Sequence, residues 1–160
     1  MERYCNVCWQ SPVGVIEISG TDKYITSLQF TDFFTPPPDD VPELFTRCIR
    51  ELEEYFRHER TEFDIPYKQK GSAFEQAVWK ALAQIPYGTT TSYRAIAEMS
   101  GNVRATRAVG NACNKNQLLI LVPCHRVVGQ KDLTGYNGGR LRKEFLLNRE
   151  ASKPVQLILF

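Results

Sequence analysis

Two short runs of β-branched and aromatic residues stand near the start of the chain. Residues 13–18 form the first run and residues 24–30 form the second, and Thr21 and Asp22 between them suit a turn. Valine, isoleucine, threonine and phenylalanine are favoured on a half-buried sheet. The pattern therefore predicts a β-hairpin.

Residues 41–56 follow a different period, because apolar side chains recur there at every third or fourth position. Charged residues occupy the other faces, as in an amphipathic helix. Three prolines at 36–38 break regular structure before it. We expect a helix that lies on the sheet of the hairpin, and then an edge strand over 61–67, in which Pro66 is tolerated. The apolar positions of the helix are Val41, Leu44, Phe45, Cys48, Ile49, Leu52, Tyr55 and Phe56.

A polar segment that ends in Gly71 separates this block from a second one, so we place a domain boundary there. Ser72 and Glu75 have the spacing of a capping box, in which the two side chains bind the free N–H groups at the start of a helix. Pro86 and Gly88 end that helix. Its predicted buried stripe consists of Phe74, Val78, Ala81, Leu82 and Ile85.

Two more short helices are predicted, and a turn that contains Gly101 joins them. Thr91 or Ser92 can cap the first, and the second begins near Asn102 or Val103 and continues to Ala112. Such a pair is typical of a helix-turn-helix. We place several small residues and two arginines on the second helix of this pair. Such a helix suits either tight helix packing or close contact with a nucleic-acid backbone. These residues are Arg104, Ala105, Arg107, Ala108, Gly110 and Ala112.

The composition of the 160 residues is that of a globular protein, with 42% apolar and 24% charged residues. No apolar run reaches the roughly 20 residues that span a bilayer, and we expect no secretory leader. The number of cysteines is five, which is odd and disfavours a full disulfide framework. We therefore expect a cytoplasmic protein in a reducing compartment.

The net charge of +2 hides a division between the two blocks. Residues 1–70 carry 8 Lys and Arg against 13 Asp and Glu, a net charge of −5, whereas residues 71–160 carry 12 against 5, a net charge of +7. A basic block suits a polyanionic partner such as nucleic acid. An unevenly charged solvated surface is the alternative.

An apolar run over residues 118–122 ends at Pro123, Cys124, His125 and Arg126. The run delivers a rigid segment into the interior, and the proline fixes a turn with the cysteine at its tip. A buried cysteine is most often inert, but one beside imidazole and guanidinium groups can have a lowered pKa and act as a nucleophile. In that case a third group must orient the histidine.

The segment 123–128, Pro-Cys-His-Arg-Val-Val, closely resembles the active-site motif of the O6-alkylguanine-DNA alkyltransferases. Further segments resemble the same family in the same order and spacing, densely over 72–150 and loosely over 1–70. They are residues 85–88, 92–93, 106–110, 111–116, 135–139 and 143–147. The chain is thus expected to have an α+β fold. A small sheet-plus-helix support domain over 1–70 would precede a mostly helical domain with the helix-turn-helix over 71–152 and a tail over 153–160.

The resemblance implies a role for each matching residue in the chemistry. Cys124 would accept the alkyl group, and His125 would draw its proton through a bound water. Glu150 would orient the imidazole, as in hydrolytic triads. Asn116 would brace the active-site turn, and Tyr93 would donate a proton or hydrogen bond to the leaving base.

The resemblance also implies how DNA and the damaged base are held. The partner would be double-stranded DNA with O6-alkylguanine, bound in the minor groove, with the nucleotide flipped out and Arg107 filling its space. Other DNA-binding residues would be Arg104, Ala105, Ala108, Lys115 and Arg126, with Arg140, Arg142 and Lys143 as further phosphate contacts. The base pocket would be formed by Tyr136, Asn137, Gly138, Gly139 and Val127.

Two positions depart from the family pattern. Gln117 stands where proline is usual, and Arg140 where many relatives carry leucine. Some members hold zinc in the first domain, but Thr21 and Thr26 fall at two of the ligand positions. We therefore expect no metal. We also expect no cofactor and a monomeric protein.

Repair by irreversible transfer of the alkyl group to Cys124, once per molecule and without a regulatory domain, is the function that these residues predict. Three alternatives remain open at this point. A non-reacting alkyltransferase-like lesion binder would lack the cysteine. A transcription regulator would not need the motif at 123–126, and a Cys-His hydrolase would turn over.

Overall fold

The computed structural model describes residues 2–129 and 136–151 of the chain. The chain forms two compact units, Met1–Gln69 and Lys70–Phe160. The division falls one residue before the boundary that the polar segment predicts. The tail expected over 153–160 lies outside the described residues.

The first unit contains a three-stranded antiparallel sheet in the order β1-β2-β3, formed by β1 (Tyr4–Ser11), β2 (Gly14–Thr21) and β3 (Ile25–Thr31). The predicted hairpin is confirmed as β2 and β3. Strand β1 was not predicted, because it is poor in β-branched residues. It pairs with the whole of β2, from Tyr4 opposite Thr21 to Ser11 opposite Gly14.

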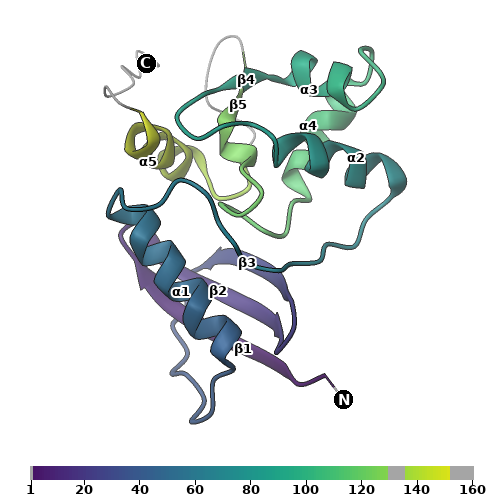
Figure 1. The fold of residues 1–160 in the computed structure, drawn as a ribbon. Coiled ribbons are helices and arrows are strands. Elements are labelled where there is room, and N and C mark those ends of the chain that lie inside the picture. The colour runs from purple at the N-terminus through teal and green to yellow at the C-terminus, as the bar shows by residue number, and fades with distance from the viewer. Residues whose placement is uncertain (1, 130–135, 152–160) are drawn as a thin grey trace. The chain divides into compact units, whose positions relative to one another are not determined.

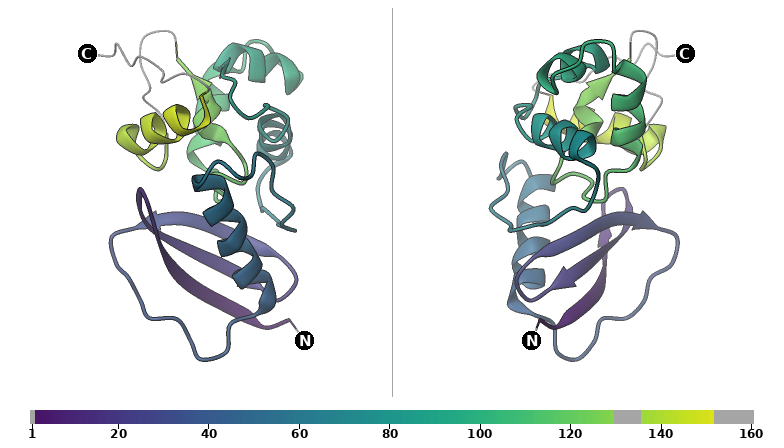
Figure 2. Two further views of the ribbon diagram at one scale, coloured as in Figure 1. Left: turned by 60° about the vertical axis from the view of Figure 1, so that its left-hand side comes forward. Right: turned by 90° about the vertical axis from the view of Figure 1, so that its right-hand side faces the viewer.

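Helix α1 (Glu43–Phe56) lies across one face of this sheet (Figures 1 and 2), as its apolar period predicts. Phe45, Leu52 and Tyr55 are fully buried on the helix, as are Ile16 and Leu28 on the sheet. These side chains form the core of the first unit, so burial of one apolar face holds the helix and the sheet together.

The edge strand expected over 61–67 is reduced to a single bridge between Ile25 and Tyr67. Ile25 donates its N–H to the carbonyl of Pro66 and accepts a bond from the N–H of Lys68. Proline has no N–H to donate, so it can supply only the carbonyl to such a pairing.

The second unit is mostly helical, with two very short strands (Figure 1). Its helices are α2 (Ala73–Leu82), α3 (Tyr93–Met99), α4 (Thr106–Asn114), the 3-10 turn η1 (Cys124–Arg126) and α5 (Arg140–Glu150). The predicted capping box of α2 is confirmed. Ser72 Oγ accepts a bond from the N–H of Glu75, and Glu75 Oε1 accepts one from the N–H of Ser72.

Helices α3 and α4 form the predicted helix-turn-helix. Ser92 caps α3 by accepting a bond from the N–H of Ala95. Helix α4 begins only at Thr106, so the placement of Arg104 and Ala105 on the same helix as Arg107 was wrong. The side-chain oxygen of Asn102 accepts a hydrogen bond from the N–H of Arg104. This bond stabilises a turn instead of helix, so α4 does not begin near Asn102.

The strands β4 (Thr91–Ser92) and β5 (Val127–Val128) pair in parallel, which the sequence pattern did not reveal. Two residues are too few to show a period. Their pairing joins the start of α3 to the segment that follows Cys124, and it therefore positions Tyr93. In the part of the chain that the structure describes, none of the helices is long and apolar enough to cross a membrane.

Replacement of Ser72 by alanine tests the capping box. We expect Ser72→Ala to lower the free energy of unfolding by about 1 kcal/mol, because an N–H at the start of α2 loses its acceptor. Ser72→Asp restores an acceptor and should recover the stability. Urea unfolding monitored by circular dichroism measures both, and equal losses in the two variants would contradict the assignment.

Candidate active site

Two tight turns bring Cys124 to its position. Leu121 donates its N–H to the carbonyl of Leu119 across Ile120, and Cys124 donates to the carbonyl of Val122 across Pro123, both at 2.8 Å. Ile120 has a φ of 72°, which is strained for a β-branched residue. The run at 118–122 is buried as predicted, and its backbone forms turns.

The side chain of Asn116 ties this turn to the thiol. Its Nδ2 donates to the carbonyl of Val122 at 2.9 Å and to Cys124 Sγ at 3.2 Å. Its Oδ1 accepts a bond from the N–H of Leu118 at 3.0 Å. Asn116 is buried, so these bonds fix both the shape of the turn and the direction of the sulfur.

Burial governs the protonation of Cys124. The side chain is only 3% exposed, and this burial raises the pKa of Cys124 to about 11, although the hydrogen bond from Asn116 and the charge of Lys143 act in the opposite direction. The sequence left open an inert buried thiol or a thiol with a lowered pKa, and in the free protein this environment favours the inert thiol. At neutral pH the group is a thiol, and it becomes nucleophilic only when a base removes its proton.

His125, the next residue in the chain, is the candidate base for Cys124, and it is completely buried. Burial lowers the pKa of His125, so the imidazole is neutral at physiological pH. Its Nε2 lies 2.7 Å from Glu150 Oε2. A carboxylate only accepts, so Nε2 carries the hydrogen and Nδ1 has a free lone pair. Among the described residues Nδ1 has no hydrogen-bond partner.

Arg126 holds the carboxylate that orients His125. Its Nε donates to Glu150 Oε1 at 2.8 Å, its Nη2 donates to Oε2 at 3.0 Å, and its Nη1 donates to the carbonyl of Ile85 at 2.6 Å. Burial favours a protonated Glu150, but His125 and Arg126 together lower the pKa of Glu150 to about 2. The carboxylate thus stays charged, although it lies at the C-terminal end of α5, where the helix dipole disfavours a negative charge.

Two predicted phosphate contacts were wrong. Arg126 is 6% exposed and Lys143 is 0% exposed, and both donate to groups inside the second unit. Neither side chain reaches the surface where a phosphate would lie. Sequence reasoning missed the Arg126–Glu150 pair because an arginine in a loop is usually a surface residue.

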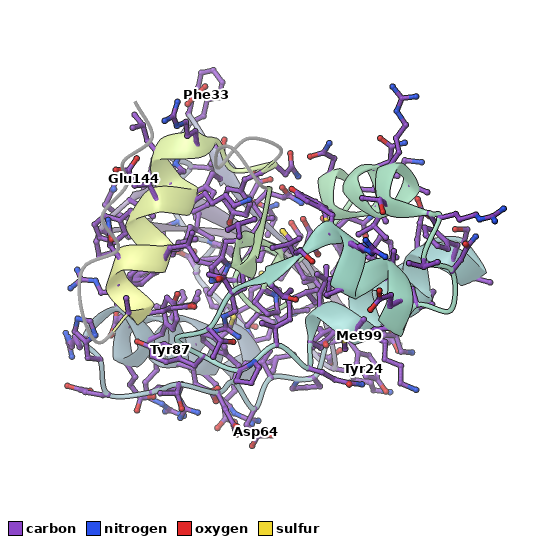
Figure 3. All side chains as sticks on the ribbon, turned by 90° about the horizontal axis from the view of Figure 1, so that it is seen from above. Tyr24, Phe33, Asp64, Tyr87, Met99 and Glu144 are labelled. Atoms are coloured by element: carbon purple, nitrogen blue, oxygen red, sulfur yellow. The ribbon has the colours of Figure 1, made fainter. Side chains whose placement is uncertain are left out.

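Residues 85–88 hold the end of α5. Ile85 supplies the carbonyl that binds Arg126, and Tyr87 Oη donates to the carbonyl of Arg149 at 3.3 Å. Tyr87 accordingly lies beside α5 in Figure 3. Gly88 has a φ of 80°, and an added Cβ would stand 3.2 Å from the carbonyl oxygen of Glu150. The segment therefore fixes the helix end that carries Glu150.

The residues predicted to form the base pocket lie around this cluster. The ring of Tyr136 is buried at 6.3 Å from the ring of His125, nearly perpendicular to it, and its hydroxyl has no partner among the described residues. Asn137 Nδ2 donates to the backbone carbonyl of Asn116 at 3.5 Å. Gly138 is buried, and Gly139 precedes α5 with a φ of 93° that favours glycine.

Val127 is also fully buried, and its carbonyl accepts a bond from Lys143 Nζ at 2.6 Å. Tyr93, the first residue of α3, is half-buried, with its ring centroid 6.0 Å from that Nζ. The structure thus brings Tyr93 and Val127 to the same lysine. Val127 belongs to β5, and Tyr93 directly follows β4, with which β5 pairs.

The predicted DNA-binding residues lie on the exposed side of the helix-turn-helix. Arg104, Arg107 and Ala108 are exposed, and Ala105 is half-buried. Lys115 is exposed and lies 3.3 Å from Glu75. The opposite face of α4 is buried through Val109, Ala112 and Cys113. Small residues on α4 therefore serve packing at Ala112, while those near Arg107 leave the backbone open to a partner.

Residues 2–129 and 136–151 contain no group of three or more His, Cys, Asp or Glu placed to hold a metal ion. Cys5 and Cys8 are buried as free thiols in β1.

Both units match known families. Residues 73–152 match the family model described as 6-O-methylguanine DNA methyltransferase, DNA binding domain, which defines the class of the second unit. Residues 4–69 match the model described as 6-O-methylguanine DNA methyltransferase, ribonuclease-like domain. The chain belongs to the 6-O-methylguanine DNA methyltransferase family.

Individual relatives are similar over almost the whole chain. The methylated-DNA--protein-cysteine methyltransferase of Mycolicibacterium paratuberculosis is 44% identical over 156 residues, which is 94% of each chain. The protein of that name from Methanosarcina acetivorans is 42% identical over 90% of this chain and 96% of its own. A crystal structure of the Mycobacterium tuberculosis O6-methylguanine methyltransferase has a TM-score of 0.85 at 40% identity and 99% coverage of both chains. A complex of the Mycobacterium tuberculosis protein with DNA has a TM-score of 0.82 at 41% identity and 98% coverage of both chains.

Acid titration tests the role of Glu150 in the fold. Its pKa is lower in the folded protein than the ordinary value of 4.5, so its stabilising effect is complete above 4.5 and is lost as the pH falls from there toward 2. We expect Glu150→Gln to be less stable at neutral pH, because Arg126 loses its charged partner. Its stability should also fall less steeply in that acid range.

Urea unfolding at a series of pH values measures this slope. Glu144→Gln, on the same helix, is the matched control and should keep the slope of the unchanged protein. An unchanged slope in Glu150→Gln would contradict the assignment.

Proposed function

We propose that this protein repairs DNA by direct reversal, moving the alkyl group from O6 of guanine to Cys124 Sγ. The observation that carries the proposal is the buried cluster in which Asn116 holds the thiol and the neighbouring His125 is held by Glu150. Family membership supports the DNA substrate and the reaction class.

The first step activates the thiol. His125 is neutral with its lone pair on Nδ1, so it can take the proton of Cys124 through a bound water. The imidazolium that results is stabilised by the Glu150 carboxylate at 2.7 Å. Because the pKa of Cys124 is raised, the thiolate does not form spontaneously at neutral pH. It forms when His125 takes the proton.

The second step is a displacement at saturated carbon. The thiolate attacks the alkyl carbon, the S–C bond forms, and the C–O bond breaks with its electron pair passing to guanine. Tyr93 donates a proton to the leaving base, and the proton held by His125 restores the tyrosine. In total, a thiol and an O6-alkylguanine become a thioether and guanine, and no cofactor is consumed.

The product explains why each molecule would act once. Water does not cleave a thioether, whereas it does hydrolyse the thioesters of cysteine hydrolases. Cys124 therefore stays alkylated and the protein is used up in the reaction.

The DNA would be bound through the exposed side of the helix-turn-helix. Arg107 is exposed on α4, and it would enter the duplex from the minor groove and fill the space of a flipped nucleotide. Arg104 and Lys115 flank it as phosphate contacts. The second unit has an excess of basic residues, so its binding to DNA should weaken as the salt concentration rises.

We also propose that the protein acts in the cytoplasm as a monomer. The five cysteines are all free and buried, which suits a reducing compartment.

Intact-mass spectrometry after incubation with a duplex that contains one O6-methylguanine tests the acceptor. We expect one added methyl group per protein, located on Cys124 by peptide mapping. Cys124→Ser should bind the duplex without gaining mass, because its hydroxyl is a far weaker nucleophile. Cys113→Ser removes the other buried thiol of unit 2 and is the matched control, which should still accept one methyl group.

Two outcomes would overturn the proposal. Tight lesion binding without added mass would identify a non-reacting alkyltransferase-like protein. Loss of the lesion without modification of the protein would identify an enzyme that turns over.

Arg107→Ala tests the insertion of the side chain. We expect affinity for the lesion duplex to fall by about tenfold or more, with a smaller loss on undamaged duplex, since a wedge acts only when a nucleotide is flipped. Arg104→Ala should weaken both duplexes alike, as a phosphate contact does. Fluorescence anisotropy measures the affinities, and equal losses for Arg107→Ala would make it a phosphate contact too.

A further inference from the structure

Two buried polar atoms without partners belong to neighbouring side chains of the second unit. Among the described residues of this unit, three buried side-chain atoms have no hydrogen-bond partner, namely His125 Nδ1, Tyr136 Oη and Asn148 Oδ1. The first two belong to rings that stand nearly perpendicular, with their centroids 6.3 Å apart. A buried polar atom without a partner destabilises the folded protein, and native structures contain few of them. This pair therefore calls for a bridging group.

The surroundings of the pair decide what that group is. His125 is completely buried and Tyr136 is 8% exposed, so bulk solvent does not satisfy either atom. The two atoms also form no bond with each other. Where buried polar groups stand farther apart than one hydrogen bond, an ordered water molecule commonly joins them. Such a water makes about three hydrogen bonds, so two partners hold it only weakly.

The proposed function already requires one water molecule, which carries the proton of Cys124 to His125 Nδ1. We propose that Tyr136 is a positioning residue for this proton transfer, whose hydroxyl supplies the third hydrogen bond to that water. The water would accept the thiol hydrogen and would donate to His125 Nδ1 and to Tyr136 Oη. This inference rests on the proposed function and extends it, because it identifies the group that holds the water in place.

The protons balance in this arrangement. As the S–H bond of Cys124 breaks, its proton passes to the water, and a hydrogen of the water passes to His125 Nδ1. A thiolate, an imidazolium and an unchanged water remain. During the transfer the water carries positive charge, and Tyr136 Oη stabilises that charge by accepting its other hydrogen. The tyrosine exchanges no proton and acts by fixing the position of the water.

The hydroxyl of Tyr136 stays neutral beside the thiol. Burial, together with the nearby Cys124 and Glu150, raises the pKa of Tyr136 well above its ordinary value, although the charge of Arg142 acts in the opposite direction. A phenolate would repel the thiolate that forms, whereas a neutral hydroxyl does not. The three atoms that the water needs therefore belong to one buried cluster, on Cys124, His125 and Tyr136.

The other polar side chains of this cluster already have partners. Asn116 uses its amide on the sulfur and on the backbone of the active-site turn. Both carboxylate oxygens of Glu150 are hydrogen-bonded. The ammonium group of Lys143 donates to a backbone carbonyl. The hydroxyl of Tyr136 is thus the group of this cluster that is left to hold the water, as far as the described residues extend.

Two other roles of Tyr136 are separated from this one by Tyr136→Phe, which keeps the ring and removes the hydroxyl. A side chain that only forms a wall of the base pocket would need the ring alone. A direct contact to the damaged base would change how tightly the lesion is bound. Tyr55→Phe removes the hydroxyl of a fully buried tyrosine in the first unit and is the matched control.

Three quantities are measured for each variant. Fluorescence anisotropy gives the affinity for a duplex that contains O6-methylguanine. Single-turnover methyl transfer at saturating protein gives the maximal rate constant. Alkylation of Cys124 by iodoacetamide at neutral pH, located by peptide mass spectrometry, reports removal of the thiol proton without DNA. Circular dichroism and thermal unfolding establish that each variant is folded.

We expect Tyr136→Phe to lower the maximal rate constant of methyl transfer about tenfold, because the water that carries the proton is held less well. Alkylation by iodoacetamide should slow by a similar factor, and the affinity for the lesion duplex should not change. The unfolding temperature should not fall, since the hydroxyl has no partner in the described protein to lose. Tyr55→Phe should keep both rates.

A double-mutant cycle tests whether the hydroxyl acts through His125. His125→Gln keeps a donor for Glu150 but has no basic nitrogen. Without the base the water has no proton to deliver, so adding Tyr136→Phe to His125→Gln should leave the rate of alkylation unchanged. If Tyr136 only supported the fold, its replacement would slow alkylation by the same factor with and without His125, and this result would overturn the inference.

A folded Tyr136→Phe with unchanged rates would also overturn it. A loss confined to the affinity for the lesion duplex would assign the hydroxyl to the base instead. Failure of Tyr136→Phe to fold would assign the hydroxyl to the fold, and both results contradict the inference. The two proposals fail differently: an unchanged protein that takes up no methyl group contradicts the proposed function, whereas alkylation by iodoacetamide tests the hydroxyl independently of DNA.

Discussion

The buried ion pair between Arg126 and Glu150 is the interaction on which the site depends. It joins η1, the end of α5 and the carbonyl of Ile85 at distances of 2.6 to 3.0 Å. Two charges removed from water are stable together only when their remaining hydrogen bonds are also made. Here they are made, and the ionised Glu150 then fixes which nitrogen of His125 carries the hydrogen. The position of Glu150 and the protonation of His125 therefore have the same origin.

Burial sets the second condition of the site, which is an unreactive thiol. A free thiolate on a protein that can react only once would be lost to any stray electrophile. With its pKa raised to about 11, Cys124 stays protonated until a base and a substrate are both in place. Under the proposed function, the same buried environment therefore explains why the thiol is inert by itself and why it reacts with the lesion. Asn116 and Lys143 moderate the effect of burial without abolishing it.

Sequence patterns predicted the elements that have a period or a cap. The hairpin β2–β3, helix α1 and the capping box of α2 are where the apolar spacing and the residues Ser72 and Glu75 place them. Strand β1 and the short β4–β5 pair were not found, because the first is poor in β-branched residues and the second is too short for a pattern. Helix α4 starts late because an Asn102 turn precedes it, and a local side-chain bond of this kind competes with helix without changing the apolar period.

By itself, the sequence determined the two-block organisation, the helix-turn-helix and the motif at 123–128 with its family resemblance. Each of these is written in spacing and residue type along the chain. Only the tertiary structure shows that Arg126 and Lys143, which the sequence predicts as phosphate contacts, are buried. The reason is physical: a charged residue has the same letter on a surface and in a core, and its partners, Glu150 and Val127, are far away along the chain. The sequence also left the pKa of Cys124 open. Burial raises it, since desolvation depends on everything packed around a group and not on its neighbours in sequence.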